Sequence, residues 1–200
     1  LAQRDFTIDA LAIDLNQVTL AEEQLVLREI IDPFGGKKDL RQKRIRVVSE
    51  AAFPSDPLRL LRAVRLAAEF GFSIDSETED LIRRHAGLIT NVAGERVREE
   101  LLRLLSLPGA GKFLVYLNDR GLLTSLIPEL AEAKGVAQPV IHVWDVLEHS
   151  LQTVSAVDFL LRQGEWEYAN KEVLAVVPWS ERLANHFNQA VSHGSTRASL

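Results

Sequence analysis

An aspartate and an arginine stand three residues apart at the start of a predicted helix. Asp56 followed by Pro57 is typical of a helix start, with an N-cap side chain and a proline at the first helical position. Arg59 then falls in the first turn, where the helix dipole makes a cation mildly unfavourable. A ligand with hydrogen-bonding or anionic groups would explain this arginine. The alternative is an ordinary amphipathic helix with an N-cap and a solvated arginine face.

The residues after Asp56 predict two sides of that helix, because each residue turns by about 100°. The apolar side carries Leu60, Leu61, Val64, Ala67 and Ala68. The opposite side carries Arg59, Arg62, Arg65 and Glu69.

A second group with possible chemistry lies in the longest helical pattern, residues 142–162. His142, Asp145 and His149 are spaced i, i+3 and i+7, which predicts one helix face and residue types that can hold a metal ion. The alternative is that these polar side chains pack against a neighbouring element, and this alternative is favoured.

Strand-like patterns precede Asp56. Residues 6–15 alternate enough to predict a strand, residues 24–31 a second strand, and residues 45–48 a short third one. Between the last two, residues 32–40 predict a turn around Gly35 and Gly36.

Helical patterns fill the rest of the chain. The arginine helix should end at Gly71, and a second helix should run from Asp75 to about Gly87. Further helices are expected over residues 95–105, 112–120, 142–162 and 180–191, with short pieces over 122–133. The predicted fold class is therefore α+β at the N-terminus, with a partial sheet, followed by a mostly α-helical remainder.

Composition narrows the classes of protein. The 200 residues contain no cysteine, which excludes disulfides and thiolate metal sites. No apolar run is long enough to span a bilayer, so no membrane partner and a cytoplasmic location are expected. The net charge is −5, yet residues 28–65 hold ten Lys and Arg against five Asp and Glu. This basic block suggests a partner that carries phosphate.

Four ordered motifs resemble one family, the class II tRNA nucleotidyltransferases (CCA-adding enzymes) and the related bacterial poly(A) polymerases. Residues 3–11 match Arg-Arg-Asp-Phe-Thr-Ile-Asn-Ala-Leu, with Gln3 and Asp9 as departures. Residues 32–40 match Asp-Pro-x-x-Gly-x-x-Asp-Leu, residues 55–66 match Glu-Asp-x-x-Arg continuing into Leu-Arg-Ala-x-Arg-Phe, and residues 95–101 resemble the neck motif.

The resemblance implies that Asp56 and Arg59 act as a protein template, whose hydrogen-bonding edges select CTP or ATP. It implies triphosphate contacts for Arg62 and Arg65 and ribose or phosphate contacts for Arg4 and Asp5. The flexible loop that adjusts the pocket would contain Asp32, Gly35, Gly36 and Asp39. Glu95 and Arg96 would support the neck.

Two departures from the family pattern affect the expectations. Ser55 stands where the family has Glu, which changes the support of the template pair. In the family, a phosphate-binding Gly-Gly motif and the Asp-x-Asp metal ligands lie upstream of the Arg-Asp motif, and neither is present in this chain, so we expect Mg²⁺ to be bound by residues outside it. We therefore expect a fragment that has no catalytic residues of its own and is inactive alone.

The implied organisation has three parts. Residues 1–53 would end the nucleotidyltransferase head, 54–126 would form the neck that selects nucleotides and binds RNA, and 127–200 would begin a helical body with an HD-like region. The full-length enzyme would add CMP and AMP to tRNA 3′ ends and release pyrophosphate, with ATP and CTP as substrates. Poly(A) polymerase activity and a helical RNA-binding or HD-type phosphohydrolase module are the alternatives. The choice among CCA, CC, A and poly(A) addition, and the oligomeric state, stay open.

Overall fold

The computed structural model describes residues 1–21, 24–27, 30–138, 143–162, 168, 181–192 and 195–196. The chain divides into two compact units, Leu1–Leu88 (unit 1) and Ile89–Leu200 (unit 2). The division falls inside the segment 54–126 that the sequence analysis assigns to the neck, and the three functional domains stay predictions. Within the described residues, no helix combines the length and the apolar character needed to cross a membrane.

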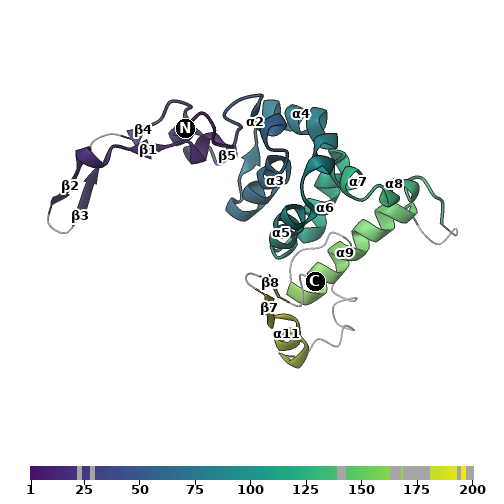
Figure 1. The fold of residues 1–200 in the computed structure, drawn as a ribbon. Helices are drawn as coiled ribbons and strands as arrows, with labels where there is room; N and C mark the ends of the chain where they lie inside the picture. Colours follow the sequence, from purple (N-terminus) through teal and green to yellow (C-terminus); the bar gives the residue numbers. More distant parts are fainter. Residues whose placement is uncertain are drawn as a thin grey trace. The chain divides into compact units, whose positions relative to one another are not determined.

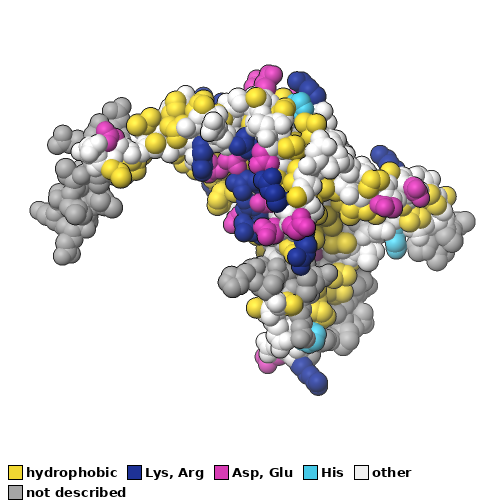
Figure 2. Space-filling view, viewed as in Figure 1, with side chains coloured by type: hydrophobic (Ala, Val, Ile, Leu, Met, Phe, Trp, Pro, Cys, Tyr) yellow, Lys and Arg dark blue, Asp and Glu magenta, His cyan; other side chains and the backbone are white. Residues whose placement is uncertain are grey.

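Short antiparallel pairs form the start of unit 1 (Figure 1). Strand β1 (Ala12–Ile13) pairs with β4 (Ile30–Ile31), and β2 (Val18–Ala21) pairs with β3 (Gln24–Leu27). The strand predicted over residues 24–31 is thus confirmed in its described parts. Ile13 and Ile31 are 39% and 48% exposed, and Figure 2 shows hydrophobic side chains on the surface of this segment.

The strand predicted over residues 6–15 is mostly wrong. Thr7–Asp9 and Leu15–Gln17 form 3₁₀ turns, η1 and η2, and β1 is the one strand in this range. The alternation was misleading because Phe6, Thr7 and Ile8 are all buried, whereas a half-buried strand would turn Thr7 to solvent. The Thr7 hydroxyl can be buried because it donates to Asp39.

Helices pack around a short parallel pair in the rest of unit 1. Strand β5 (Arg44–Ile45) lies beside β6 (Ser73–Ile74), and Phe6 forms a bridge with Val47. The helices are α1 (Gly36–Arg41), α2 (Ala52–Ser55), α3 (Arg59–Phe70) and α4 (Ser76–His85). The core includes the fully buried side chains of Phe6, Ile45, Phe53, Leu60, Leu61 and Ile82.

Helix α3 confirms much of the predicted arginine helix. Leu60, Leu61 and Val64 are buried as predicted, and Gly71 ends the helix with a φ of 64°. The alternative in which the arginines of this helix form a solvated face does not hold for Arg65. Every residue from 60 to 66 except Arg62 is buried, because the middle of α3 is surrounded on nearly all sides.

Unit 2 is mainly helical, and a 3₁₀ segment, η3 (Ala86–Asn91), contains the point where the units divide. Its elements are α5 (Gly94–Leu105), α6 (Ala110–Asp119), α7 (Leu122–Leu126), α8 (Glu129–Glu132), α9 (Val146–Arg162), α11 (Glu181–Phe187) and the antiparallel pair β7 (Ala190–Ser192) and β8 (Ser195–Thr196). The predicted helices over 95–105, 112–120 and 122–133 are confirmed, whereas the last residues of the one predicted over 180–191 are extended. The α+β start and helical remainder are confirmed.

The proposed metal-binding helix face is not formed. Helix α9 begins at Val146, so Asp145 precedes it, and His142 lies outside the described residues. The Asp145 carboxylate accepts hydrogen bonds from the backbone N–H of Glu148 (2.8 Å) and of Gly135 (2.7 Å). These bonds lower the pKa of Asp145 and identify it as a helix cap.

Candidate functional site

An ion pair joins the N-terminal segment to α3. Arg62 Nε donates to Asp5 Oδ2 at 2.8 Å across 57 residues of sequence, and Arg62 Nη2 lies 2.8 Å from the same oxygen in an ion pair. Asp5 is 7% exposed. Burial raises the pKa of Asp5, but the Arg62 charge and hydrogen bonds, with backbone N–H groups, hold that pKa below its usual value. The residues assigned to phosphate contacts therefore lie together, with Asp5 as an ionised partner of Arg62.

Arg59 holds the same N-terminal segment from one turn earlier in α3. Its Nη2 donates to the Gln3 carbonyl oxygen at 2.7 Å. Its Nη1 donates to the Ala52 carbonyl oxygen at 3.1 Å and to Ser55 Oγ at 3.0 Å. Ser55 is the position where the family has Glu, so a hydroxyl here takes part in orienting the guanidinium.

Asp56 caps the start of α3, but in a different position from that predicted. The helix begins at Arg59, two residues after the predicted proline start, with Leu58 as the N-cap residue. The first turn is a 3₁₀ turn, in which the Arg59 N–H donates to the Asp56 carbonyl oxygen at 3.1 Å. The Asp56 side chain accepts from the Leu58 N–H at 3.3 Å. Asp56 and Arg59 thus flank one turn, and their role as a template pair stays a prediction.

Arg65 is held by contacts within the protein. It is buried and forms an ion pair with Glu69, one turn further along α3. Its predicted triphosphate contact stays a prediction.

Arg4 and Asp9 complete the polar cluster beside Asp5. Arg4 Nε donates to the Asp9 carbonyl oxygen at 3.1 Å. Burial raises the pKa of Asp9, and the negative charge and hydrogen bonding of Asp5 raise it further. The family has Asn at the position of Asp9. The Asn side-chain amide could donate a hydrogen bond to Asp5 at every pH, whereas the Asp9 carboxyl can donate only when it is protonated.

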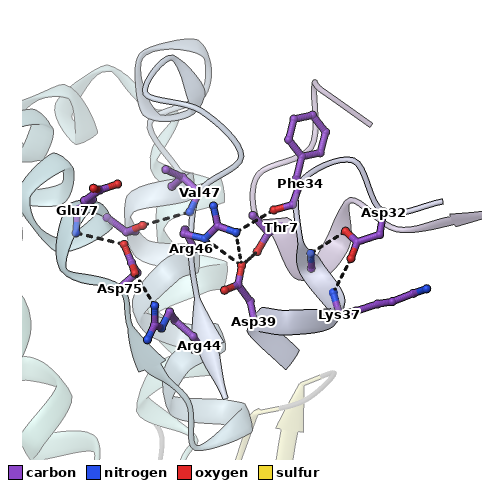
Figure 3. A network of polar contacts seen from close by, with 12 residues as sticks. Thr7, Asp32, Phe34, Lys37, Asp39, Arg44, Arg46, Val47, Asp75 and Glu77 are labelled. Carbon is purple, nitrogen blue, oxygen red and sulfur yellow. Dashed lines mark hydrogen bonds and ion pairs between the residues drawn. The ribbon is translucent and has the colours of Figure 1, made fainter. Parts of the chain in front are cut away.

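The glycine turn is built around a capped helix, which the sequence analysis did not predict. Asp32 accepts hydrogen bonds from the backbone N–H groups of Gly36 (2.7 Å) and Lys37 (2.9 Å), at the start of α1 (Figure 3). The Lys37 and Gly36 bonds and the nearby Lys37 charge lower the pKa of Asp32. Gly35 has a φ of 79°, and a Cβ on Gly36 would lie 2.1 Å from the Thr7 carbonyl oxygen. The flexible-loop role stays a prediction.

Asp39 lies at the centre of a buried network that sequence reasoning missed. Thr7 Oγ1 donates to Asp39 Oδ2 at 2.6 Å, and Arg46 Nη2 lies 2.7 Å from the same oxygen (Figure 3). Arg46 Nη2 also donates to the Phe34 carbonyl oxygen at 2.8 Å. Thr7 and Asp39 belong to two of the recognised motifs, which is the one signal that could have indicated their contact.

Other candidates lie elsewhere. Glu95 and Arg96 occupy exposed positions in the first turn of α5, and their neck-supporting role stays a prediction. A cleft of about 430 Å³ opens between residues 46–50 and α4, without the template pair in its lining. Within the described ranges, no group of three or more His, Asp or Glu could hold a metal ion, so these residues do not fit the Mg²⁺ that the family implies.

Comparisons with known proteins match both units. Residues 1–46 match the family described as the poly A polymerase head domain, and residues 71–134 match the one described as a probable RNA- and SrmB-binding site of polymerase A. The A-adding tRNA nucleotidyltransferase of Deinococcus radiodurans is 36% identical over 77% of this chain, and the CCA-adding enzyme of Geobacillus stearothermophilus is 33% identical over 99%.

A solved structure is also similar to this chain. A tRNA nucleotidyltransferase complexed with a primer tRNA and an incoming ATP analogue matches 80% of this chain and 41% of its own, with 28% identity and a TM-score of 0.59. The chain spans 34% of the length of the Deinococcus relative and 50% of the Geobacillus relative.

Proposed function

Because this chain belongs to the family of class II tRNA nucleotidyltransferases and poly(A) polymerases, we propose that it selects nucleotides and binds RNA in tRNA 3′-end synthesis. The complete protein adds CMP, AMP or both to tRNA and releases pyrophosphate. ATP and CTP are its nucleotide substrates, and the tRNA 3′ end is its second substrate.

The observation that carries this proposal is the convergence of two motifs on one cluster. Arg59 and Arg62 reach the segment Gln3–Asp5 from successive turns of α3, at distances of 2.7 and 2.8 Å. These contacts hold Arg4 and Asp5 beside the helix start that carries the template pair. A polar cluster built from both motifs supports a site where a base edge and a sugar-phosphate are bound together.

The hydrogen bonds of Arg59 fit a role in recognising the base of the incoming nucleotide. A guanidinium has five N–H donors. The contacts found among the described residues use both Nη1 donors and one Nη2 donor, which fixes the plane of the group. The Nε–H and the second Nη2–H then supply donors to a base edge, and the Asp56 carboxylate supplies an acceptor. Cytosine and adenine each offer an amino donor beside a ring-nitrogen acceptor, which this pair complements.

The described residues contain no fitting set of ligands for Mg²⁺, so no catalytic step is assigned to them. Their contribution is binding and selection: Asp56 and Arg59 pair with the base, while Arg4, Asp5 and Arg62 orient the sugar and phosphates. This division makes nucleotide discrimination, separately from phosphate chemistry, the property that these residues control.

The experiment is an extension assay with the complete protein encoded by the gene. A tRNA transcript that ends before CCA is incubated with CTP, ATP, both, UTP or GTP, and products are resolved to single nucleotides. Addition of one to three residues that requires CTP or ATP supports the proposal, and the lengths distinguish A, CC and CCA addition. A long adenosine tail would favour the poly(A) polymerase alternative. No extension with any nucleotide would contradict the proposed function.

A further inference from the structure

Helix α1 presents cations on its outer side and buries the opposite side. Because successive residues turn by about 100°, Lys37, Lys38 and Arg41 fall within an arc of about 100°. The two buried residues of α1, Gly36 and Asp39, lie on the other side of the helix. Figure 3 shows the Lys37 side chain extending away from the network around Asp39. We call Lys37, Lys38, Arg41 and the following Lys43 the α1 cationic face.

Three of these four cations differ from Arg44 and Arg46, the basic residues that follow them in the chain. Lys38, Arg41 and Lys43 are exposed, and no side-chain hydrogen bond or ion pair is found for them among the described residues. By contrast, Arg44 pairs with Asp75 at 3.2 Å, and Arg46 pairs with Asp39 at 2.7 Å. Cations without acidic partners therefore gather on α1, within a chain whose net charge is −5.

Lys43 adds an independent observation. Its φ is 52°, and it is the one non-glycine residue with positive φ in the described part of the chain. Its N–H donates to the Leu40 carbonyl oxygen at 3.2 Å, and its carbonyl oxygen accepts from the Ser73 N–H at 2.9 Å, so this turn links α1 to the sheet. Glycine adopts this conformation without strain, whereas a lysine is disfavoured there. A strained residue whose side chain points to solvent suggests a role for that side chain.

The helix dipole explains part of the pattern, because cations near a helix C-terminus are favourable. It does not explain Lys37 in the first turn. It also does not explain a lysine at the positive-φ position, where glycine would end the helix more readily. A ligand rich in anionic groups accounts for all four positions.

We propose that the α1 cationic face binds the phosphate backbone of the RNA substrate, as a contact surface outside the RNA-binding region matched at residues 71–134. This inference rests on the proposed function, because RNA is the polyanion that the function supplies. Phosphate contacts of this kind position the RNA without reading its sequence, and they make affinity strongly dependent on salt.

The test measures binding of the complete protein to a tRNA transcript by fluorescence anisotropy across a range of salt concentrations. Neutralising the face by Lys37→Gln, Lys38→Gln and Arg41→Gln together should weaken binding by at least about tenfold at low salt. The slope of log affinity against log salt should fall by roughly one for each lost phosphate contact. Arg44→Gln is the matched control, because its guanidinium is already paired with Asp75. If Arg44→Gln weakens binding as much as Lys38→Gln alone, net charge is responsible and the proposed surface is wrong.

Lys43→Gly separates binding from folding. The variant should melt at the same temperature as wild type or a few degrees higher, since glycine relieves the backbone strain. It should nevertheless bind tRNA about threefold more weakly. Unchanged affinity in both Lys43→Gly and the triple variant would overturn the inference.

Two readouts keep this inference apart from the proposed function. Wild-type protein that neither binds nor extends tRNA contradicts the proposed function itself, whereas wild-type binding that the variants leave intact contradicts only the α1 surface. The last measurement tests binding of the wild-type and variant proteins to phosphatidylcholine vesicles with and without phosphatidylserine. Charge-dependent vesicle binding that requires these side chains, without RNA binding, would assign the face to a membrane and overturn the RNA proposal.

Discussion

Arg62 donates a hydrogen bond through Nε to Asp5 Oδ2 and forms an ion pair with the same oxygen through Nη2, although 57 residues separate them in sequence. The pair fixes the N-terminal segment against α3 at the place where the motif residues meet. Asp5 is nearly buried, while the Arg62 side chain is 32% exposed. Loss of the arginine would leave a carboxylate with little access to water.

The first prediction concerns this pair. Arg62→Ala should destabilise the protein by about 1–3 kcal/mol, because it leaves the Asp5 charge without its main partner. Arg62→Lys should recover only part of the loss, since an ammonium cannot present the planar fork. Urea unfolding measures the change. Arg83→Ala is the control, because Arg83 and Asp80 form an exposed pair and should contribute less than about 0.5 kcal/mol.

The second prediction is a pH dependence at Asp9. The raised pKa means that the folded protein holds this proton more tightly than the unfolded chain does. Ionisation of Asp9 therefore lowers stability as pH rises from the ordinary aspartate pKa through the raised folded pKa. Asp9→Asn cannot ionise and should be more stable than wild type at pH 7 by about 0.5–1 kcal/mol.

The difference between the two proteins should shrink as the pH falls through the raised pKa and below the ordinary aspartate pKa, where Asp9 is protonated in both the folded and the unfolded wild type. Asp5 contributes with the opposite sign, because its pKa is lowered, and its stabilisation is lost as pH falls below the ordinary aspartate pKa through the lowered folded pKa. That loss falls at a lower pH than the Asp9 effect, so the two contributions are distinguished by their pH ranges. Urea unfolding at several pH values measures the profile, and parallel profiles for wild type and Asp9→Asn would contradict the prediction.

Local sequence patterns predicted where the helices lie, but they predicted poorly which side chains contact one another between the helices. Leu60, Leu61 and Val64 follow the helical period, and Gly71 supplies the left-handed end of α3. Family membership was also predictable, because four short motifs appear in order.

Burial of charged residues was not predictable from the same patterns. Arg65 has the spacing of an exposed face, yet α3 is enclosed and Glu69 provides its partner. Thr7, Asp39 and Arg46 meet from separate segments, so no local window contains all three. Asp145 resembled a metal ligand because aspartate occurs both in metal sites and as a helix cap. Only the position of the first turn of α9, which begins after Asp145, distinguishes the two roles.

The third prediction concerns the packing of α6 against α9. A Cβ on Gly111 would lie 2.6 Å from the Ser155 Cα, a backbone atom that cannot move without shifting α9. Gly111→Ala should therefore destabilise the protein by about 1–3 kcal/mol despite the better helix propensity of alanine. Gly94→Ala, in α5, meets nothing within 4 Å and should be neutral or stabilising by about 0.4–1 kcal/mol. Thermal unfolding of both variants measures the contrast, and equal effects would contradict the predicted close contact.

The last prediction separates a cap from a template at Asp56. If Asp56 only caps the first turn of α3, Asp56→Asn should behave as wild type, because asparagine is an equally good cap. If one carboxylate oxygen caps the Leu58 N–H and the other reads the base, asparagine keeps one acceptor for the cap and turns an NH2 donor towards the base amino group, which is left unpaired in a desolvated site. Each such loss is worth roughly 1–3 kcal/mol, or tenfold and more in selection. The complete enzyme is compared with its Asp56→Asn variant by steady-state kinetics on tRNA with CTP, ATP, UTP and GTP. We expect the ratio of kcat/KM for correct over incorrect nucleotides to fall at least about tenfold while the melting temperature stays near that of wild type. An unchanged ratio would reduce Asp56 to a helix cap.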